Sequence, residues 1–373
     1  MAPRSDALFE IFLMAPPGLE DTLLDEVKGK GFKRPRAVPG GVVLLGGWPE
    51  VWRANLWIRG VGRVLARIDS FRVQHLAALD ACARHVPWAS VLRPDIPFRV
   101  EATCAKSHIY HSGAAAERIE TAIKKSLGAP LSPEAEVTVR VRIENDQCTI
   151  SVDTSGELLH KRGHKLAVNA APMRETMASL FLRQCGFDGN EPVLDPMCGS
   201  GTLIIEAAEI AARLNPGRSR SFAFEQLVTF DAEAWERMRA VSPARSPSAL
   251  FHGSDRDAGA IAMSEANAER AGVAGFTRFR QAVISEVEPP PGPPGLVLVN
   301  PPYGNRLGDR RELLPLYQSL GQVLLRRFAG WRVGLIAADA RLAEATRLPF
   351  LPPGPAVPHG GLRVTLFRTA PLG

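Results

Sequence analysis

One short stretch, Asn300-Pro301-Pro302-Tyr303-Gly304, constrains the fold more than any other part of the sequence. It follows the apolar run 295–299, which comes after a proline-rich loop and has the pattern of a buried strand. Proline donates no backbone hydrogen bond to a sheet, so two prolines in succession end the strand and stiffen the turn. We therefore predict that Asn300, Pro301, Pro302 and Tyr303 lie at the C-terminal end of a strand, where open α/β sheets bind their ligands.

The chemistry of these groups suits a reaction at an exocyclic amine. The lone pair of an amine on an aromatic base is delocalised into the ring, which makes the nitrogen a poor nucleophile. The Asn300 side-chain oxygen and the Pro301 carbonyl can accept the two N–H hydrogens and favour the pyramidal geometry needed for attack. The Tyr303 ring can stack on the base, as enzymes that work on an extruded base require. A strand-ending turn with an incidental tyrosine is the alternative interpretation.

A glycine turn lies upstream of this stretch. A short apolar run ends at Asp195, Gly199-Ser200-Gly201 follows, and an apolar helical pattern begins at Thr202. Strand, glycine turn and helix form the first βα unit of a nucleotide-type site, because glycines let the backbone approach a ligand closely. The phosphate-binding pattern Gly-x-x-x-x-Gly-Lys-Ser/Thr is absent from the sequence, and so is the full Gly-x-Gly-x-x-Gly.

Together, Asp-Pro-Met-Cys-Gly-Ser-Gly-Thr at 195–202 and Asn-Pro-Pro-Tyr-Gly at 300–304 resemble the class I S-adenosylmethionine-dependent methyltransferases that act on exocyclic amines. More narrowly, the chain is similar over nearly its whole length to the THUMP-containing RNA guanine-N2 methyltransferases, whose bacterial members include the 23S rRNA enzyme. The resemblance implies an α/β fold: a Rossmann-like class I methyltransferase domain preceded by an α+β ferredoxin-like/THUMP RNA-binding region. It also implies methyl transfer from S-adenosyl-L-methionine to the N2 amine of a guanosine in RNA, with 23S rRNA the first expected partner and tRNA the second.

The resemblance assigns the cofactor site to the ends of the first three strands of that domain. The residues expected at the methionine end belong to the glycine turn: Asp195, Pro196, Cys198, Gly199, Ser200, Gly201 and Thr202. Asp255, which ends the next expected strand, would accept hydrogen bonds from both ribose hydroxyls, with Arg256 and Val283 beside the adenine. The family usually has an aspartate where Ala282 stands, so adenine recognition is expected to differ here. Asp257 is a better candidate than Asp255 for the cap of the following helix.

Composition and charge restrict the number of domains, the class of partner and the cellular compartment only broadly. A chain of 373 residues with 45% hydrophobic residues can bury a full core and predicts two or three domains. The net charge of +6 is compatible with a polyanionic partner but is a weak signal alone. Five scattered cysteines without Cys-x-x-Cys spacing indicate reduced thiols in a cytoplasm and no metal site. Because we find neither a signal peptide nor a membrane span, we expect a cytoplasmic protein without a membrane partner.

Four regions are expected along the chain: a ferredoxin-like region at 1–70, a THUMP domain at 71–155, a linker with a leading helix at 156–192, and the methyltransferase domain at 193–373. From 193 onward, strand patterns alternate with helical ones, which predicts a mostly parallel sheet covered on both faces. A segment at 215–248, rich in Arg, Ser, Pro and aromatic residues, interrupts this alternation and is expected to be an insertion in the methyltransferase domain.

Six basic side chains are candidates for contact with an RNA backbone. Four belong to the expected THUMP domain and two to the linker: Lys106, His108, Lys124, Lys125, Lys161 and Arg162. Ordinary surface charge is the alternative for the first four, and a plain charged linker is the alternative for the last two.

Other activities use the same pair of motifs. They serve N6-adenine and N4-cytosine methylation of DNA and N5-glutamine methylation of proteins. The THUMP-like N-terminal half favours RNA, since a DNA enzyme would need a recognition domain that the sequence does not show. A non-catalytic RNA-binding or ribosome-assembly factor that kept the fold is the alternative from another functional class.

Overall fold

The computed structural model describes residues 8–166, 173–241, 244–302 and 310–373. Its contacts divide the chain into two compact units. The first unit takes the chain up to Ala15, Leu23–Leu159 and Arg220–Val241. The second takes Pro16–Thr22, His160–Ser219 and the chain from Ser242 onward. Within the described ranges, no helix combines the length and the apolar character that crossing a bilayer requires.

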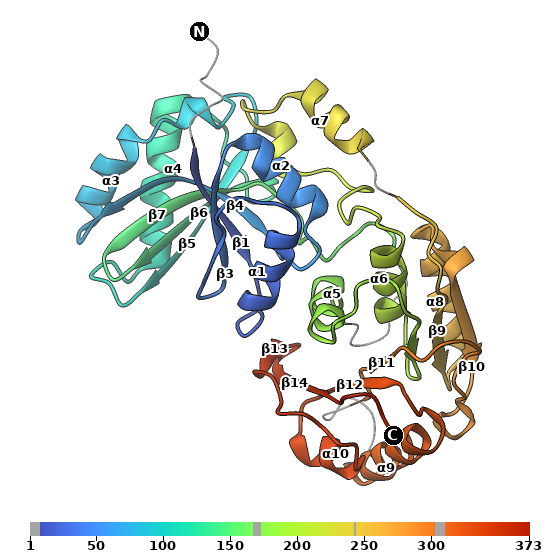
Figure 1. Cartoon of the computed structure of the whole chain (residues 1–373). Coiled ribbons are helices and arrows are strands. Elements are labelled where there is room, and N and C mark those ends of the chain that lie inside the picture. The colour runs from blue at the N-terminus through green and yellow to red at the C-terminus, as the bar shows by residue number, and fades with distance from the viewer. Residues whose placement is uncertain (1–7, 167–172, 242–243, 303–309) are drawn as a thin grey trace. The chain divides into compact units, whose positions relative to one another are not determined.

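The first unit is built on one seven-stranded sheet with the order β2-β3-β1-β4-β7-β6-β5 (Figure 1). Only β5 and β6 run parallel among these neighbours. The strands are β1 (Phe9–Met14), β2 (Arg36–Val38), β3 (Gly41–Gly46), β4 (Val64–Arg72), β5 (Phe98–Ala105), β6 (Val137–Glu144) and β7 (Gln147–Asp153). The helices are α1 (Glu20–Gly29), α2 (Trp48–Trp57), α3 (Leu76–His85), η1 (Trp88–Ser90), α4 (Ser112–Leu127), η2 (Ala223–Gln226) and α7 (Ala232–Ala240).

The two N-terminal regions expected from the sequence share this sheet. β4 pairs with β7 along a ladder from Leu65↔Asp153 to Arg72↔Gln147, with one irregularity between Arg67 and Asp69. The boundary expected after residue 70 therefore falls inside β4. A local pattern of strands and helices did not reveal this continuity, because the pairing joins segments far apart in the sequence.

The segment Arg220–Val241 belongs to the first unit, although we expected it in the methyltransferase domain. Its Phe224 is fully buried and stacks on Phe222 with ring centroids 5.2 Å apart. Phe224 also meets the edge of Trp235 at 5.0 Å and lies 6.1 Å from Trp52 of α2. These aromatic side chains complete the core of the first unit, which explains why the segment departs from the alternating pattern around it.

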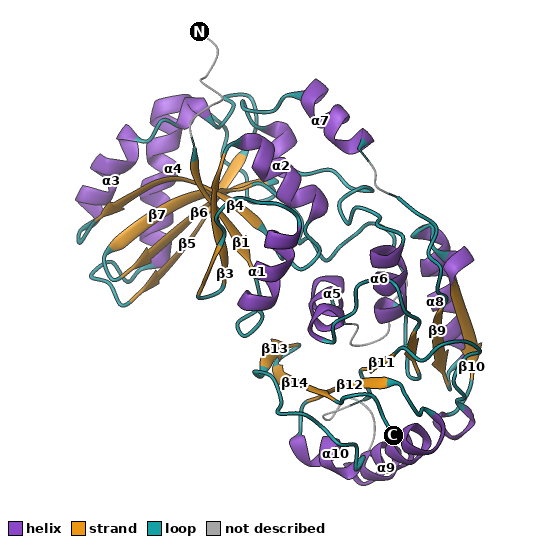
Figure 2. Cartoon of the chain, viewed as in Figure 1, coloured by secondary structure: helices purple, strands orange, loops and turns teal. Residues whose placement is uncertain are grey.

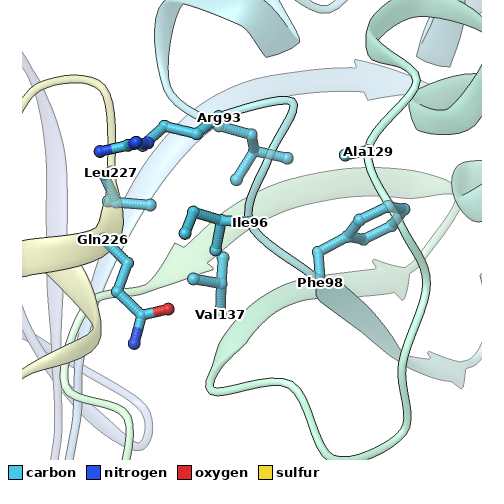
Figure 3. A pocket seen from close by; sticks show the side chains of 8 residues that line it. Arg93, Ile96, Phe98, Ala129, Val137, Gln226 and Leu227 are labelled. Atoms are coloured by element: carbon cyan, nitrogen blue, oxygen red, sulfur yellow. The ribbon is translucent and has the colours of Figure 1, made fainter.

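Figure 3 shows a second contact of this segment with the sheet region. Gln226 and Leu227 lie beside Arg93, Ile96 and Val137, with Phe98 on the far side, and the volume open to water among these side chains is about 0 Å³. The contact is therefore packing of the protein against itself and offers no room for a ligand.

The second unit has a seven-stranded sheet with the order β10-β9-β8-β11-β12-β14-β13. Its strands are β8 (Val193–Asp195), β9 (Phe251–Asp255), β10 (Thr277–Gln281), β11 (Leu296–Val299), β12 (Arg332–Ala337), β13 (Val357–His359) and β14 (Leu362–Arg368). The first five are parallel, while β14 is antiparallel to β12 and β13 is antiparallel to β14. Its helices are α5 (Glu175–Gln184), α6 (Thr202–Ala211), α8 (Ala258–Arg270), η3 (Ala274–Phe276), η4 (Ile284–Glu286), α9 (Arg310–Arg327) and α10 (Ala340–Ala345).

The order of the strands changes direction at β8. From β8 the chain runs outward through β9 and β10 and then returns to β11 on the other side of β8. β8 and β11 are thus neighbours, with Leu194 opposite Val297. The crevice beyond the carboxyl ends of two such strands is the usual ligand site of a parallel α/β sheet. This arrangement brings the glycine turn after β8 and Asn300 after β11 to the same end of the sheet.

The crossover from β10 to β11 contains the short helix η4 and is otherwise loop (Figure 2). A helix normally covers the sheet in such a crossover. Here a cavity of about 330 Å³ remains, lined by Leu194, His252, Ser254, Arg278, Arg280 and the 287–291 loop, among others. None of the site residues expected from the sequence lines it, so this cavity is separate from the candidate active site.

Candidate active site

The end of β11 presents a buried hydrogen-bond acceptor. Val297 and Val299 are fully buried, and Asn300 follows them directly. The Asn300 side-chain oxygen, Oδ1, is buried and has no hydrogen-bond partner in the described part of the chain. Leaving a buried acceptor unpaired costs roughly 1–3 kcal/mol, which a donor from a bound molecule would recover. An unpaired acceptor therefore lies at the position that we predicted, and its role toward an amine substrate stays a prediction.

The prolines after Asn300 hold this turn against α9. Pro301 is buried, and the Pro302 carbonyl accepts a hydrogen bond of 3.4 Å from the hydroxyl of the buried Tyr317. The stacking residue that we predicted, Tyr303, lies outside the described residues. Tyr317 was not predicted, because nothing in the sequence distinguishes it from other apolar residues on the inner face of α9.

Side chains of α8 hold the glycine turn through hydrogen bonds to its carbonyl groups. Gly199 and Gly201 have φ values of 54° and 83°, in the left-handed region that favours glycine. The Ser264 hydroxyl donates to the Gly199 carbonyl at 2.9 Å, and the Asn267 amide donates to the Ser200 carbonyl at 3.1 Å. Both α8 side chains are fully buried. Sequence reasoning missed them, and their only signal was two polar residues three positions apart on the inner face of an expected helix.

The remaining residues of the turn are also placed by the structure. Pro196 and Thr202 are buried, and Thr202 begins α6. The Cys198 sulfur lies 3.8 Å from the Ser264 hydroxyl, and burial raises the pKa of this thiol well above its ordinary value. Cys198 is therefore a neutral thiol that packs against α8, and it is not a reactive thiolate.

Asp195 at the end of β8 is almost completely buried. One carboxyl oxygen accepts the Met197 backbone N–H at 3.0 Å. Burial raises the pKa of Asp195 to about 8, and nearby Asp255 acts in the same direction. The carboxyl group is thus protonated at neutral pH and would ionise readily if a cation bound beside it.

Asp255 at the end of β9 connects the strand ends. One of its oxygens accepts the Gly199 N–H at 3.0 Å and the other accepts the Asp257 N–H at 3.0 Å. A carboxylate has about four acceptor sites, so it keeps the capacity to bind hydroxyl groups. The helix cap expected at Asp257 is confirmed, because its carboxylate accepts the Gly259 N–H at 2.8 Å.

The residues expected beside an adenine lie at neighbouring strand ends, since Gln281 of β10 is opposite Asp255. Arg256 and Val283 are both exposed there. The Ala282 N–H donates to the Asp255 carbonyl at 2.9 Å, so this amide is already used within the protein. Adenine recognition through the Ala282 backbone N–H is therefore excluded in this conformation.

These groups fit S-adenosyl-L-methionine. Asp195 offers a buried carboxyl group for a cation, Asp255 offers acceptors for hydroxyls, and the glycine turn lets a ligand approach the backbone closely. In the described ranges, no group of three His, Cys, Asp or Glu side chains is arranged to hold a metal ion.

The basic residues expected to contact RNA are spread over separate surfaces. Lys106 and His108 lie between β5 and α4, whereas Lys124 and Lys125 occupy the last turn of α4. The 16 residues of α4 span about 24 Å. The four side chains are exposed but do not form one compact patch.

In the second unit, Lys161 is exposed, but the expectation for Arg162 is wrong. Arg162 is only 2% exposed, and its guanidinium Nε donates to the fully buried Glu206 at 3.2 Å. A charge buried in an ion pair is not available to a phosphate. The sequence did not reveal this ion pair, because Glu206 is far from Arg162 along the chain.

Comparisons with known proteins agree with this geometry. Three family models match: the RMKL-like methyltransferase domain at residues 162–349, the RlmL ferredoxin-like domain at 10–65 and the THUMP domain at 73–153. The ribosomal RNA large subunit methyltransferase K/L of Methylococcus capsulatus is 33% identical over 351 residues, which is 90% of this chain and 47% of that protein. The chain thus spans about half the length of this curated relative.

Two solved structures share the fold over almost the whole chain. A predicted N6-adenine-specific DNA methylase from Listeria monocytogenes is 28% identical, with a TM-score of 0.86 over 97% of this chain and 96% of that one. A possible methylase from Clostridium difficile is 26% identical, with a TM-score of 0.90 over 98% of this chain and 99% of that one.

Proposed function

We propose that the chain methylates the exocyclic N2 amine of a guanosine in RNA, with 23S rRNA as its first substrate. The proposal starts from the family, since the chain belongs to the RMKL-like methyltransferase domains. The fold class predicted from the sequence is confirmed, with ferredoxin-like, THUMP and methyltransferase regions. The predicted cofactor, S-adenosyl-L-methionine, is confirmed as that of the family.

The buried Asn300 Oδ1 without a partner is the observation that carries the proposal. It lies at the switch point of the sheet, beyond the strand that neighbours the glycine turn. A donor with two hydrogens, such as an aromatic amine, would satisfy this oxygen and use the Pro301 carbonyl as a second acceptor. Both prolines restrict the turn, so these acceptors are already oriented before a substrate binds.

The residues of the chain would act by positioning. S-adenosyl-L-methionine supplies an electrophilic methyl group on a positively charged sulfur. Asn300 and Pro301 would draw the amine hydrogens out of the plane of the base and concentrate the nitrogen lone pair toward that methyl group. Asp195 and Asp255 would hold the cofactor, and the buried surroundings would exclude water. The amine loses its proton once the new N–C bond has formed, so no strong general base is needed.

RNA is preferred over DNA as the substrate class. The THUMP match at 73–153 supports an RNA-binding region, and the curated relative is named as a ribosomal RNA enzyme. Similarity to the Listeria protein, a predicted N6-adenine-specific DNA methylase, makes adenine N6 of DNA the candidate outside RNA, after 23S rRNA and tRNA. We place the protein in the cytoplasm, in keeping with its five free cysteine thiols.

Nucleoside mass spectrometry of separated 23S rRNA and tRNA tests this function. Cells without the gene, and the same cells complemented with the intact gene or with Asn300→Ala, would be compared. We expect N2-methylguanosine to disappear from 23S rRNA and to return only with the intact gene. Loss from the tRNA pool alone would replace 23S rRNA with tRNA as the substrate. An unchanged N2-methylguanosine content in both RNAs would contradict the proposal that the protein methylates guanosine in RNA.

A further inference from the structure

The loop between β5 and α4, Lys106–His111, presents its side chains in alternation. Lys106, His108 and Tyr110 are exposed, whereas Ile109 is buried and Ser107 is partly buried. Tyr110 is 82% exposed, the most exposed of the large hydrophobic side chains in the described residues. The loop therefore directs a cation, an imidazole and an aromatic ring to the solvent on the same short segment.

Hydrogen bonds to the turn between β6 and β7 hold this loop. Asp146 accepts the His108 backbone N–H at 2.9 Å and contacts the His108 ring Nδ1 at 2.8 Å. The Asp146 N–H donates to the Ser107 hydroxyl at 3.0 Å, and that hydroxyl donates to the Ala105 carbonyl at 2.8 Å. Asp146 itself is buried, and the His108 N–H is the main cause that lowers its pKa to about 2. The carboxylate is therefore charged at neutral pH and keeps the loop in place.

Further contacts anchor both sides of the Asp146 turn and the end of the loop. The Gln74 amide donates to Asp146 at 3.1 Å, and the Val73 N–H donates to the Asp146 carbonyl at 2.9 Å. At the other end of the loop, His111 Nδ1 accepts the Ala114 N–H at 3.0 Å and caps α4. The buried Ile109 fixes the backbone beside Tyr110. The exposed ring is thus carried by a pre-ordered backbone, so little backbone entropy would be lost when a ligand binds.

An exposed aromatic side chain on the same short loop as a cation has the chemistry of a site for single-stranded nucleic acid. Every nucleic-acid base has a face that stacks on an aromatic ring, and cations beside the ring attract the phosphate backbone. A base-paired helix hides those faces in its own stack. The ligand that fits is therefore an unpaired nucleotide with its phosphate.

We infer that the Lys106–His111 loop binds an unpaired nucleotide of the RNA substrate, with the base stacked on Tyr110 and the adjacent phosphate near Lys106 and the exposed edge of His108. This inference rests on RNA as the substrate class of the proposed function. It deepens that function by naming a residue that sequence reasoning had not selected and by giving the mode of binding. The loop would hold a single-stranded region outside the catalytic site.

Fluorescence anisotropy with the full chain tests the stacking contact. The probes are a labelled single-stranded oligoribonucleotide and a labelled blunt RNA duplex of the same strand. Tyr110→Ala should weaken single-strand binding roughly 5- to 150-fold, the range expected for loss of one stacked base. Tyr110→Phe keeps the aromatic ring, so its affinity for the single strand should stay within about twofold of that of the original chain. Duplex binding should change little in either variant.

Leu45→Ala is the matched control, because Leu45 is also exposed (56%) in the first unit and lies on β3, away from the loop. It should leave RNA affinity unchanged. Equal affinity of Tyr110→Ala and the original chain for the single-stranded RNA would overturn the inference. A loss of affinity in Tyr110→Phe as large as that in Tyr110→Ala would also overturn it, because it would indicate a contact of the hydroxyl group in place of stacking. These outcomes are separate from failure of the proposed function, because the binding assay requires no methyl transfer. Titration with S-adenosylhomocysteine should give the same affinity in every variant.

Discussion

Asn300 and Asp195 are polar residues at the ends of two neighbouring strands, and each places a polar group in buried surroundings. Asn300 Oδ1 has no partner in the described residues, and Asp195 is buried with a raised pKa. A buried polar group of this kind lowers the stability of the fold, and such groups are therefore found mainly where a bound ligand interacts with them. At the scale of single residues, the unpaired acceptor of Asn300 and the buried carboxyl group of Asp195 define the candidate site.

Asn300→Ala should lower the rate of methyl transfer by roughly 100-fold or more, the size of effect seen when one oriented polar group is removed from an active site. Cofactor affinity should stay nearly unchanged, since Asn300 is assigned to the substrate. The free energy of unfolding should not fall, because the change removes an unpaired acceptor. Single-turnover kinetics, calorimetric cofactor titration and thermal unfolding measure the three effects.

The surface variant Asn190→Ala in the same unit is the control and should keep the original rate. Loss of cofactor binding in Asn300→Ala would show that the assignment of this residue to the amine is wrong.

Asp195 predicts a pH-dependent cofactor affinity. In the free protein its pKa is about 8, so the carboxyl group carries a proton below that pH. A bound cation favours the carboxylate and lowers this pKa, so binding releases a proton. Affinity should therefore rise with pH up to about 8 and level off above it. Calorimetric titrations from about pH 6 to about pH 9, in buffers of different ionisation enthalpy, count the released proton.

Asp195→Asn cannot ionise, so it should bind the cofactor more weakly and without this pH dependence. The same rise with pH in Asp195→Asn would assign the titration to another group.

At the scale of elements, the glycine turn depends on α8. Ser264 and Asn267 hold two carbonyls of the turn, and Arg270 donates both to the Asn267 side chain and, at 2.8 Å, to the His164 carbonyl. This chain of contacts connects the segment before α5 with the turn after β8. The geometry of the turn is therefore a property of two packed elements, and the local sequence accounts for only part of it.

Gly201→Ala should destabilise the second unit and weaken cofactor binding. The φ of 83° disfavours alanine by about 1–2 kcal/mol, and the new Cβ would lie 3.0 Å from the Cβ and the hydroxyl of Ser264. The matched control is Gly272→Ala, which has a φ of 73° and no atom within 4 Å of the new Cβ. Thermal unfolding and cofactor titration of both variants separate backbone strain from crowding. Equal losses of stability and of cofactor affinity in the two variants would mean that the contact between the glycine turn and α8 contributes to neither.

At the scale of the whole molecule, the chain leaves the second unit after Ser219 and completes the core of the first with Arg220–Val241 before it returns. A cofactor stabilises only the unit that binds it, by an amount that depends on its concentration. The two units should therefore respond differently to S-adenosyl-L-methionine during thermal unfolding.

Phe224→Ala should lower the stability of the first unit by about 3–5 kcal/mol, because it removes a fully buried aromatic side chain. Calorimetry with and without cofactor should place the loss in the transition that the cofactor does not shift, and cofactor affinity should be unchanged. Destabilisation of the cofactor-dependent transition alone would contradict the assignment of this segment to the first unit.

The sequence by itself determined the features that depend on short-range chemistry. The two prolines after Asn300 end a buried strand, the Gly-Ser-Gly turn follows a strand and opens a helix, and Asp257 caps α8. Proline, glycine and capping residues act through their own backbone or that of close neighbours, so their effects can be predicted from a few adjacent letters. The strands and helices around them followed from hydrophobic periodicity for the same reason.

Only the tertiary structure decided which distant residues meet. Arg162 was expected on the surface but is buried against Glu206, and Ser264 and Asn267 were not expected to hold the glycine turn. The 220–241 segment was expected to be part of an insertion in the methyltransferase domain, yet its aromatic side chains fill a core formed by residues far earlier in the chain. Burial and pairing at these positions depend on contacts between segments separated by many residues, and no local pattern in a single sequence records them.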